Sequence, residues 1–163
     1  MRIRRNTLWR VPVFCLAAGW ITFYLSIYMG WFFVVKTTGP DGVVDVSIDP
    51  LRSALVDITL FLLVLLVGGL WFFRSMTKAE IAFSAAILIA CLLAVNGLEL
   101  LLFPNFPVAL GLTLAKLQNW NGTISALLYQ ATDQLGLSAL VSSFAPLLFV
   151  PFGKSEAKQA RAE

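Results

Sequence analysis

Four long apolar stretches, separated by short polar connections, dominate the chain. They cover about residues 11–35, 54–73, 79–103 and 127–152. A helix of roughly 20 apolar residues crosses the hydrocarbon core of a bilayer. The pattern therefore predicts an all-α integral membrane protein, a four-helix bundle over 11–153. A polar start at 1–10 precedes the bundle and a polar tail at 154–163 follows it.

The third stretch has two distinct faces. Small residues recur along one of them at helical spacing: Ala82, Ala86, Ala90, Ala94 and Gly97. Small side chains let another helix backbone approach closely. Glu99 falls about 160° around the helix from the middle of this small-residue ridge, with Asn96 on the same flank. A carboxylate or amide that faces lipid is costly, so both faces should meet protein or water, and we expect this helix to be central.

Asp57 lies about one turn inside the boundary of the otherwise apolar second stretch. The connection at 74–78 is so short that the second and third stretches should form an antiparallel helical hairpin. In that hairpin Asp57, Asn96 and Glu99 would converge near the outer surface. Two carboxylates in a low-dielectric pocket cannot cheaply both be ionised, so one would be protonated or a cation would lie between them. We take the three residues as a candidate ion or substrate site; boundary salt bridges and polar packing are the alternative.

An aromatic stripe follows one face of the first stretch: Trp20, Tyr24, Tyr28 and Trp31. One interpretation is a groove for a flat apolar ligand, such as a quinone or a lipid tail. The other, which we favour, is helix packing with an interfacial belt at 31–33, since aromatic side chains prefer membrane boundaries. The stretch is too long for the apolar region of a secretory signal, so we expect an uncleaved anchor.

The first polar connection, residues 36–53, begins with a Gly-Pro-Asp-Gly turn. Alternation at 43–48 predicts a short extended piece, and Asp49 followed by Pro50 can start the next helix. Three aspartates of this connection, at positions 41, 45 and 49, are spaced by four residues. This spacing suggests a calcium site, but the segment lacks the closely spaced oxygen ligands of a calcium-binding loop. A solvated acidic loop is the expectation that we adopt.

Two further local signals concern helix ends. Gly68 and Gly69 permit close helix contact or a local bend near the end of the second stretch. Thr77 and Glu80 have the spacing of a capping box, which predicts that the third helix starts just after Thr77.

The second outer loop contains an apolar segment, 108–120, that is too short to cross a membrane. We expect an interfacial helix there, after a sharp stop at the prolines of 104–107. The alternative treats 108–135 as a re-entrant hairpin with 119–123 at its tip, as in pore-lining loops. Non-helical backbone is tolerated at membrane depth only beside protein or water.

The last helix should start at Ile124, with Thr123 as its N-cap. Its first part is polar over 129–134 and should be wet or covered by protein. The apolar part then runs to residue 152, and Pro146 should kink it.

Composition narrows the chemistry. The chain is 59% hydrophobic and 13% charged, whereas soluble domains carry about a quarter charged residues. Histidine is absent, which removes the usual haem ligands, most zinc and copper sites, and Ser–His or Cys–His nucleophiles. Cys15 and Cys91 lie in apolar stretches without a C-x-x-C motif. We expect no metal, no cofactor and no nucleic-acid partner.

Basic residues are distributed asymmetrically in the four-span arrangement. One side has nine of them: Arg2, Arg4, Arg5, Arg10, Arg74, Lys78, Lys154, Lys158 and Arg161. The other side has three: Lys36, Arg52 and Lys116. The positive-inside rule then places both termini in the cytoplasm. We expect a multi-pass protein of the plasma membrane, or of the bacterial inner membrane if the source is prokaryotic.

These patterns favour a non-catalytic accessory or assembly subunit that packs beside another membrane protein or a second copy of itself within the lipid bilayer. The alternative is a small oligomeric transporter or channel that uses Asp57, Asn96 and Glu99. An enzyme built on the carboxylate pair is a third class, but no catalytic motif accompanies it, so we expect no enzymatic activity.

Overall fold

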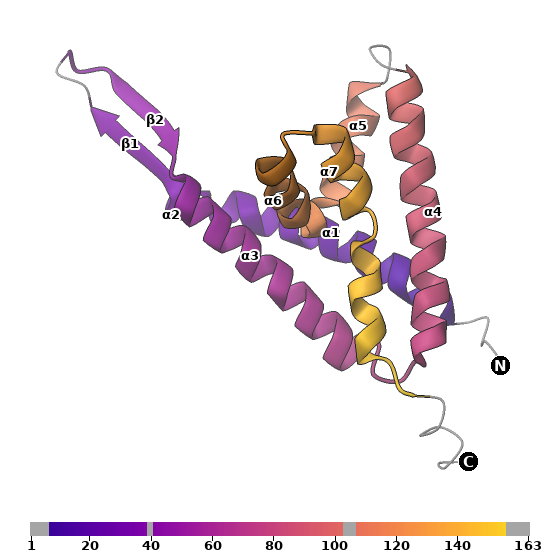
Figure 1. Ribbon diagram of the computed structural model, residues 1–163. Helices are drawn as coiled ribbons and strands as arrows, with labels where there is room; N and C mark the ends of the chain where they lie inside the picture. The colour runs from indigo at the N-terminus through magenta and orange to yellow at the C-terminus, as the bar shows by residue number, and fades with distance from the viewer. Residues whose placement is uncertain (1–6, 39–40, 103–106, 156–163) are drawn as a thin grey trace.

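The computed structural model describes residues 7–38, 41–102 and 107–155, and these are mostly helical. Figure 1 labels the α-helices and the strands: α1 (Arg10–Tyr28), α2 (Gly30–Phe33), β1 (Val34–Thr38), β2 (Val44–Ile48), α3 (Pro50–Val67), α4 (Lys78–Leu102), α5 (Val108–Leu117), α6 (Gly122–Thr132) and α7 (Leu135–Ser142). Three further elements are the π-helix η2 (Gly68–Phe72) and the 3-10 helices η3 (Asn119–Asn121) and η4 (Ala145–Phe152).

Four helical segments are long and apolar enough to cross a membrane, as the sequence predicts. They are Arg10–Tyr28, Pro50–Phe72, Lys78–Glu99 and Leu135–Phe152. The first is shorter than the predicted 11–35 and the last is shorter than the predicted 127–152. The expected stop at Pro104 lies outside the described residues.

The first apolar stretch ends early because its last residues join a β-hairpin. β1 pairs antiparallel with β2, with Val34 opposite Ile48, Lys36 opposite Val46 and Thr38 opposite Val44. β-branched residues favour the extended conformation, and Gly42 adopts φ 76° in the connection. The predicted extended piece at 43–48 is therefore confirmed. The described residues are mostly helical, as predicted, but the strand β1, which begins within the predicted first helix, was not expected.

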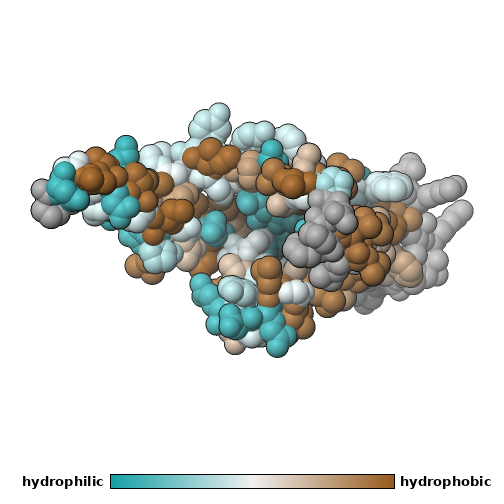
Figure 2. Space-filling model, turned by 90° about the horizontal axis from the view of Figure 1, so that it is seen from above, coloured by the Kyte–Doolittle hydropathy of each residue, from teal (hydrophilic) through white to brown (hydrophobic). Residues whose placement is uncertain are grey.

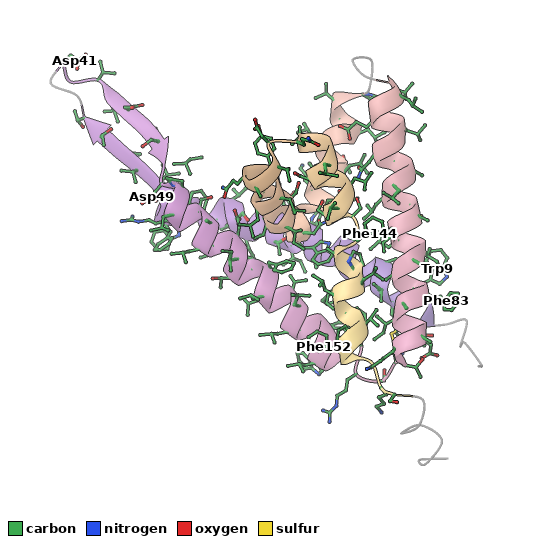
Figure 3. All side chains as sticks on the ribbon, in the orientation of Figure 1. Trp9, Asp41, Asp49, Phe83, Phe144 and Phe152 are labelled. Atoms are coloured by element: carbon green, nitrogen blue, oxygen red, sulfur yellow. The ribbon has the colours of Figure 1, made fainter. Side chains whose placement is uncertain are left out.

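The hairpin projects from the start of α3, away from the helices (Figure 1). Figure 2 shows apolar and polar side chains interspersed along it, at the left of the view. At its base, the Asp49 side chain caps α3 by accepting hydrogen bonds from the backbone N–H groups of Leu51 (3.0 Å) and Arg52 (3.2 Å). Figure 3 labels Asp49 at this junction. The predicted helix start at Asp49 and Pro50 is thus confirmed.

The long helices α3 and α4 diverge from the short turn that joins them (Figure 1). η4 lies between their lower ends and packs against α4 and η2. Its Phe149 ring is fully buried, with centroids 4.9 Å from Phe73 and 5.8 Å from both Phe14 and Trp120. This aromatic core separates the two helices, so the expected close hairpin of α3 on α4 does not form.

α1, rather than α4, is the helix around which the others gather. It packs against α3, α4, α5 and η3, whereas α4 packs mainly against α1, α7 and η4. The buried face of α4 carries Ile81, Ser84, Ala85, Leu88 and Leu92. The expectation of a central α4 is therefore wrong for the described part of the chain, where one of its two faces has no helix against it.

The two local signals near the turn are confirmed. Gly68 and Gly69 lie in η2, and a Cβ atom on Gly68 would lie 2.6 Å from a ring carbon of Phe149. Thr77 and Glu80 form the predicted capping box: the Glu80 N–H donates to Thr77 Oγ1 (3.1 Å) and the Thr77 N–H donates to Glu80 Oε2 (3.0 Å).

The C-terminal apolar stretch is broken rather than continuous. α6 begins at Gly122, before the predicted Thr123 cap, and it ends at Thr132, after which the C-cap residue Asp133 adopts φ 54°. α6 and α7 then pack together as a helical hairpin. Pro146 is the second residue of the 3-10 helix η4 and does not kink an α-helix, because the missing proline N–H is not needed in the first turn of a helix.

Candidate functional site

The segment α5–η3–α6 folds into a hairpin whose tip is inserted among the other helices. Within η3, Trp120 is 4% exposed and Asn121 is 2% exposed. η3 packs against α1 and α3. The tip at 119–123 is thus buried against the rest of the described chain, and the position of the loop relative to a membrane, interfacial or re-entrant, stays a prediction.

Gly19 allows this insertion. A Cβ atom built on Gly19 would lie 1.9 Å from the carbonyl oxygen of Leu117, far inside van der Waals contact. Only a residue without a side chain lets the end of α5 approach α1 this closely. Trp120 then stacks on Phe61 of α3, with ring centroids 6.3 Å apart and an interplanar angle of 10°.

Amide and hydroxyl groups connect the inserted tip to its neighbours. Asn119 Nδ2 donates to Thr22 Oγ1 of α1 (3.3 Å), and that hydroxyl donates to the Gly19 carbonyl (3.1 Å). Asn121 Nδ2 donates to the Ser142 carbonyl at the end of α7 (2.9 Å). Asn121 Oδ1 is buried and accepts no hydrogen bond from the residues that the structure describes. A buried acceptor of this kind is uncommon, and an ordered water often satisfies it.

α7 and its C-cap residue contribute three buried serines to this polar centre, Ser138, Ser142 and Ser143, and each hydroxyl donates to a backbone carbonyl three or four residues earlier. Ser143 Oγ donates to the Ala139 carbonyl (2.9 Å) and accepts from Asn96 Nδ2 of α4 (3.2 Å). Ser138 Oγ donates to the Gln134 carbonyl (2.8 Å). Asn96, which the sequence assigned to a carboxylate cluster, therefore bonds to a neutral hydroxyl on α7.

Asp57 and Glu99 are not brought together. Asp57 lies in the second turn of α3 and Glu99 in the last turn of α4, and these are the ends that diverge from the connecting turn (Figure 1). Neither carboxylate has a hydrogen bond or an ion pair within the described part of the chain. The predicted cluster of Asp57, Asn96 and Glu99 is thus not assembled in this structure.

Lys116 lies beside the first part of the aromatic stripe, which runs from α1 into α2. Lys116 Nζ lies 6.0 Å from the ring centroid of Trp20 and 5.2 Å from that of Phe23, within cation–π range. The Trp20 and Tyr24 rings are 5.8 Å apart. Tyr28 and Trp31, in contrast, are 75% and 80% exposed. These last two aromatic residues of the stripe are exposed, as aromatic residues of a membrane-interface belt would be.

The small-residue ridge of α4 points away from the chain's own core. Ala86, Ala90 and Ala94 are exposed, and Ala82 and Gly97 are half-buried. A Cβ atom on Gly97 would meet no atom within 4 Å. No packing against the described residues therefore explains why this position lacks a side chain.

The polar centre at the inserted tip thus holds neutral hydroxyl and amide groups, which suit hydrogen bonding more than acid–base chemistry. Among the described residues, no three His, Cys, Asp or Glu side chains come close enough to hold a metal ion. Cys15 is buried, Cys91 is exposed, and both are free. The roles of Thr22, Asn121 and Ser142 could not be predicted from the sequence, because an isolated polar residue in an apolar stretch belongs to no recognisable motif.

The fold and site define a class: a mostly helical chain with four apolar candidate spans around a neutral polar centre, consistent with a membrane protein. Neither a protein-family model, nor a curated protein, nor a solved structure matches this chain.

Proposed function

We propose that the chain is a non-catalytic accessory or assembly subunit of a membrane complex. The observation that carries this proposal is the outward small-residue ridge of α4. Lipid tails do not require small side chains, whereas close packing of a second helix does. The exposed Ala86, Ala90 and Ala94, with Gly97 one turn further, fit the surface on which a helix of another polypeptide would pack.

The arrangement of charges supports a cytoplasmic location for both termini. Arg10 Nη1 donates to Ser75 Oγ (3.0 Å) in the α3–α4 turn. Lys78 and Lys154 adjoin each other at the same end, where the Lys78 N–H donates to the Lys154 carbonyl (3.2 Å). Lys36 lies in the hairpin, at the other end of α3. Arg74 lies in the same α3–α4 turn, and the other five basic residues of the cytoplasmic set lie outside the described residues.

The mass and subunit composition of the particle, extracted gently from its native membrane, test the proposal. A second polypeptide in fixed ratio is the expected result. Ala90→Leu should remove that polypeptide, because the larger side chain blocks close approach of a helix. Ala54→Leu, at an exposed alanine of α3, is the matched control and should retain it. Loss of the second polypeptide in both variants, or in neither, would contradict the proposed role of the ridge.

Asp57 and Glu99 favour a second candidate, a small oligomeric transporter or channel. Carboxylates without partners in candidate spans are costly in a membrane, and a second copy of the chain could provide their partners. This candidate predicts a homo-oligomer and cation- or proton-dependent flux in liposomes that Glu99→Gln abolishes. A particle of this chain alone that shows no flux would exclude it.

A further inference from the structure

An open cavity of about 550 Å³ lies where the α3–α4 turn meets the end of η4. Its polar lining comes from Arg74, Lys78, Lys154 and Ser155, and its apolar lining from Pro151 and Phe152. Figure 3 labels Phe152 at the lower end of η4, beside the end of α3. Two segments that are far apart in the sequence therefore build one basic pocket.

Backbone hydrogen bonds fix the walls of this basic pocket. The Lys154 N–H donates to the Met76 carbonyl (2.9 Å), and the Lys78 N–H donates to the Lys154 carbonyl (3.2 Å). Gly153 makes this pairing possible, since a Cβ atom there would lie 2.7 Å from the Lys78 nitrogen. Phe73 and Met76, both fully buried, anchor the turn that carries Arg74. The three cations are thus held on a rigid frame.

The described lining of the pocket is positively charged. No carboxylate is among the described residues that line it, and none of its three cations has an ion pair within the described part of the chain, where Arg52 and Asp49 form one elsewhere. Like charges repel, so a cluster of this kind is stabilised when an anion lies between them. Arginine and lysine side chains with a nearby hydroxyl are the groups that bind phosphate oxygens.

We propose that this basic pocket binds a phosphate group, presented either by an anionic phospholipid headgroup or by a soluble phosphate ester. The apolar surface of Pro151 and Phe152 continues from the pocket onto the candidate span. Basic pockets at the cytoplasmic ends of membrane helices bind anionic headgroups in this way. The site is independent of the α4 ridge and of the accessory role.

The test measures binding of phosphatidylglycerol to the purified chain in phosphatidylcholine nanodiscs, and of glycerol 1-phosphate to the chain in detergent. The double variant Arg74→Gln/Lys154→Gln should bind phosphatidylglycerol about 30-fold more weakly, since each cation near an anionic surface contributes about fivefold. Lys36→Gln, which removes one positive charge in the β-hairpin, away from the pocket, should bind as the unchanged protein does and not about fivefold more weakly. The charge-conserving pair Arg74→Lys/Lys154→Arg should bind nearly normally.

The two probes separate the sources of the phosphate. Binding of phosphatidylglycerol without binding of glycerol 1-phosphate assigns the pocket to a lipid headgroup, and binding of both, with the same dependence on Arg74 and Lys154, assigns it to phosphate esters in general. The proposal is overturned if the double variant binds both probes as tightly as Lys36→Gln does. Substitution should spare the fold, because the three side chains are exposed and the frame is held by backbone groups.

Discussion

Substitution of Gly19 by alanine should destabilise the protein by moving the inserted hairpin away from α1. The new Cβ atom would lie 1.9 Å from the Leu117 carbonyl oxygen, 2.4 Å from the carbonyl carbon and 3.0 Å from the Cα atom. These are backbone atoms of a helix, so rotation of a side chain cannot relieve the overlap. Overpacking a well-packed site costs about 1–3 kcal/mol, and contact with backbone places Gly19→Ala at about 3 kcal/mol.

Gly97→Ala provides a control of opposite sign. This glycine also lies within a helix, but an added Cβ would meet nothing within 4 Å. Alanine is more favourable than glycine in a helix interior by up to about 1 kcal/mol. The same chemical change should therefore stabilise the protein at Gly97 and destabilise it at Gly19.

Cys15 provides the assay for this comparison. It is buried on α1, one turn before Gly19, whereas Cys91 is exposed. In a Cys91→Ser background, a fluorogenic maleimide added during heating reports the unfolding of α1. For a chain of this size about 1 kcal/mol shifts the midpoint Tm by 2–4 °C. We expect Gly19→Ala to lower Tm by about 6–12 °C and Gly97→Ala to raise it by about 2–4 °C.

A difference in Tm of less than about 2 °C between the two alanine variants would contradict the predicted overlap at Gly19, because it is smaller than the shift in Tm that 1 kcal/mol produces. That result would mean that the end of α5 does not press on α1 at Gly19. It would remove the main geometric support for the inserted hairpin.

Two further predictions use the same unfolding assay. Trp120→Ala removes the ring that stacks on Phe61 and should lower the free energy of unfolding by about 3–5 kcal/mol. The control Trp31→Ala, at a ring that is 80% exposed, should leave Tm nearly unchanged. An equal decrease of Tm in both variants would contradict burial of the hairpin tip. Asp49→Ala removes the N-cap of α3 and should lower the free energy of unfolding by about 1 kcal/mol. The control Asp45→Ala, at an exposed carboxylate of β2, should lower it by less than about 0.5 kcal/mol. Equal stability of the two variants would argue against the cap.

Local chemistry made part of the fold predictable. The capping box of Thr77 and Glu80 and the start of α3 after Asp49 each depend on neighbouring residues, and each is found where it was expected. The apolar stretches likewise predicted four long helical segments. These signals are short in range, so a single sequence contains them in full.

What the sequence could not predict depends on contacts between distant segments. The close approach of Leu117 to Gly19 joins residues about a hundred positions apart, and either residue alone is unremarkable in an apolar stretch. The place of Phe149 between α3 and α4 likewise depends on an aromatic core that forms only when the chain is folded. The expectation that Asp57 meets Glu99 assumed that a short turn brings its two helices together along their whole length.

The separation of these two carboxylates bears on the choice between the proposed functions. A single chain that transports a cation needs oxygen ligands converging on one path, and the described polar centre offers neutral amide and hydroxyl groups that bond to one another and to backbone carbonyls instead. Asp57 and Glu99 could serve transport only if other copies supplied their partners. The α4 ridge needs a partner helix under either proposal. Assembly is therefore the requirement that both functions share, and the composition of the native particle decides between them.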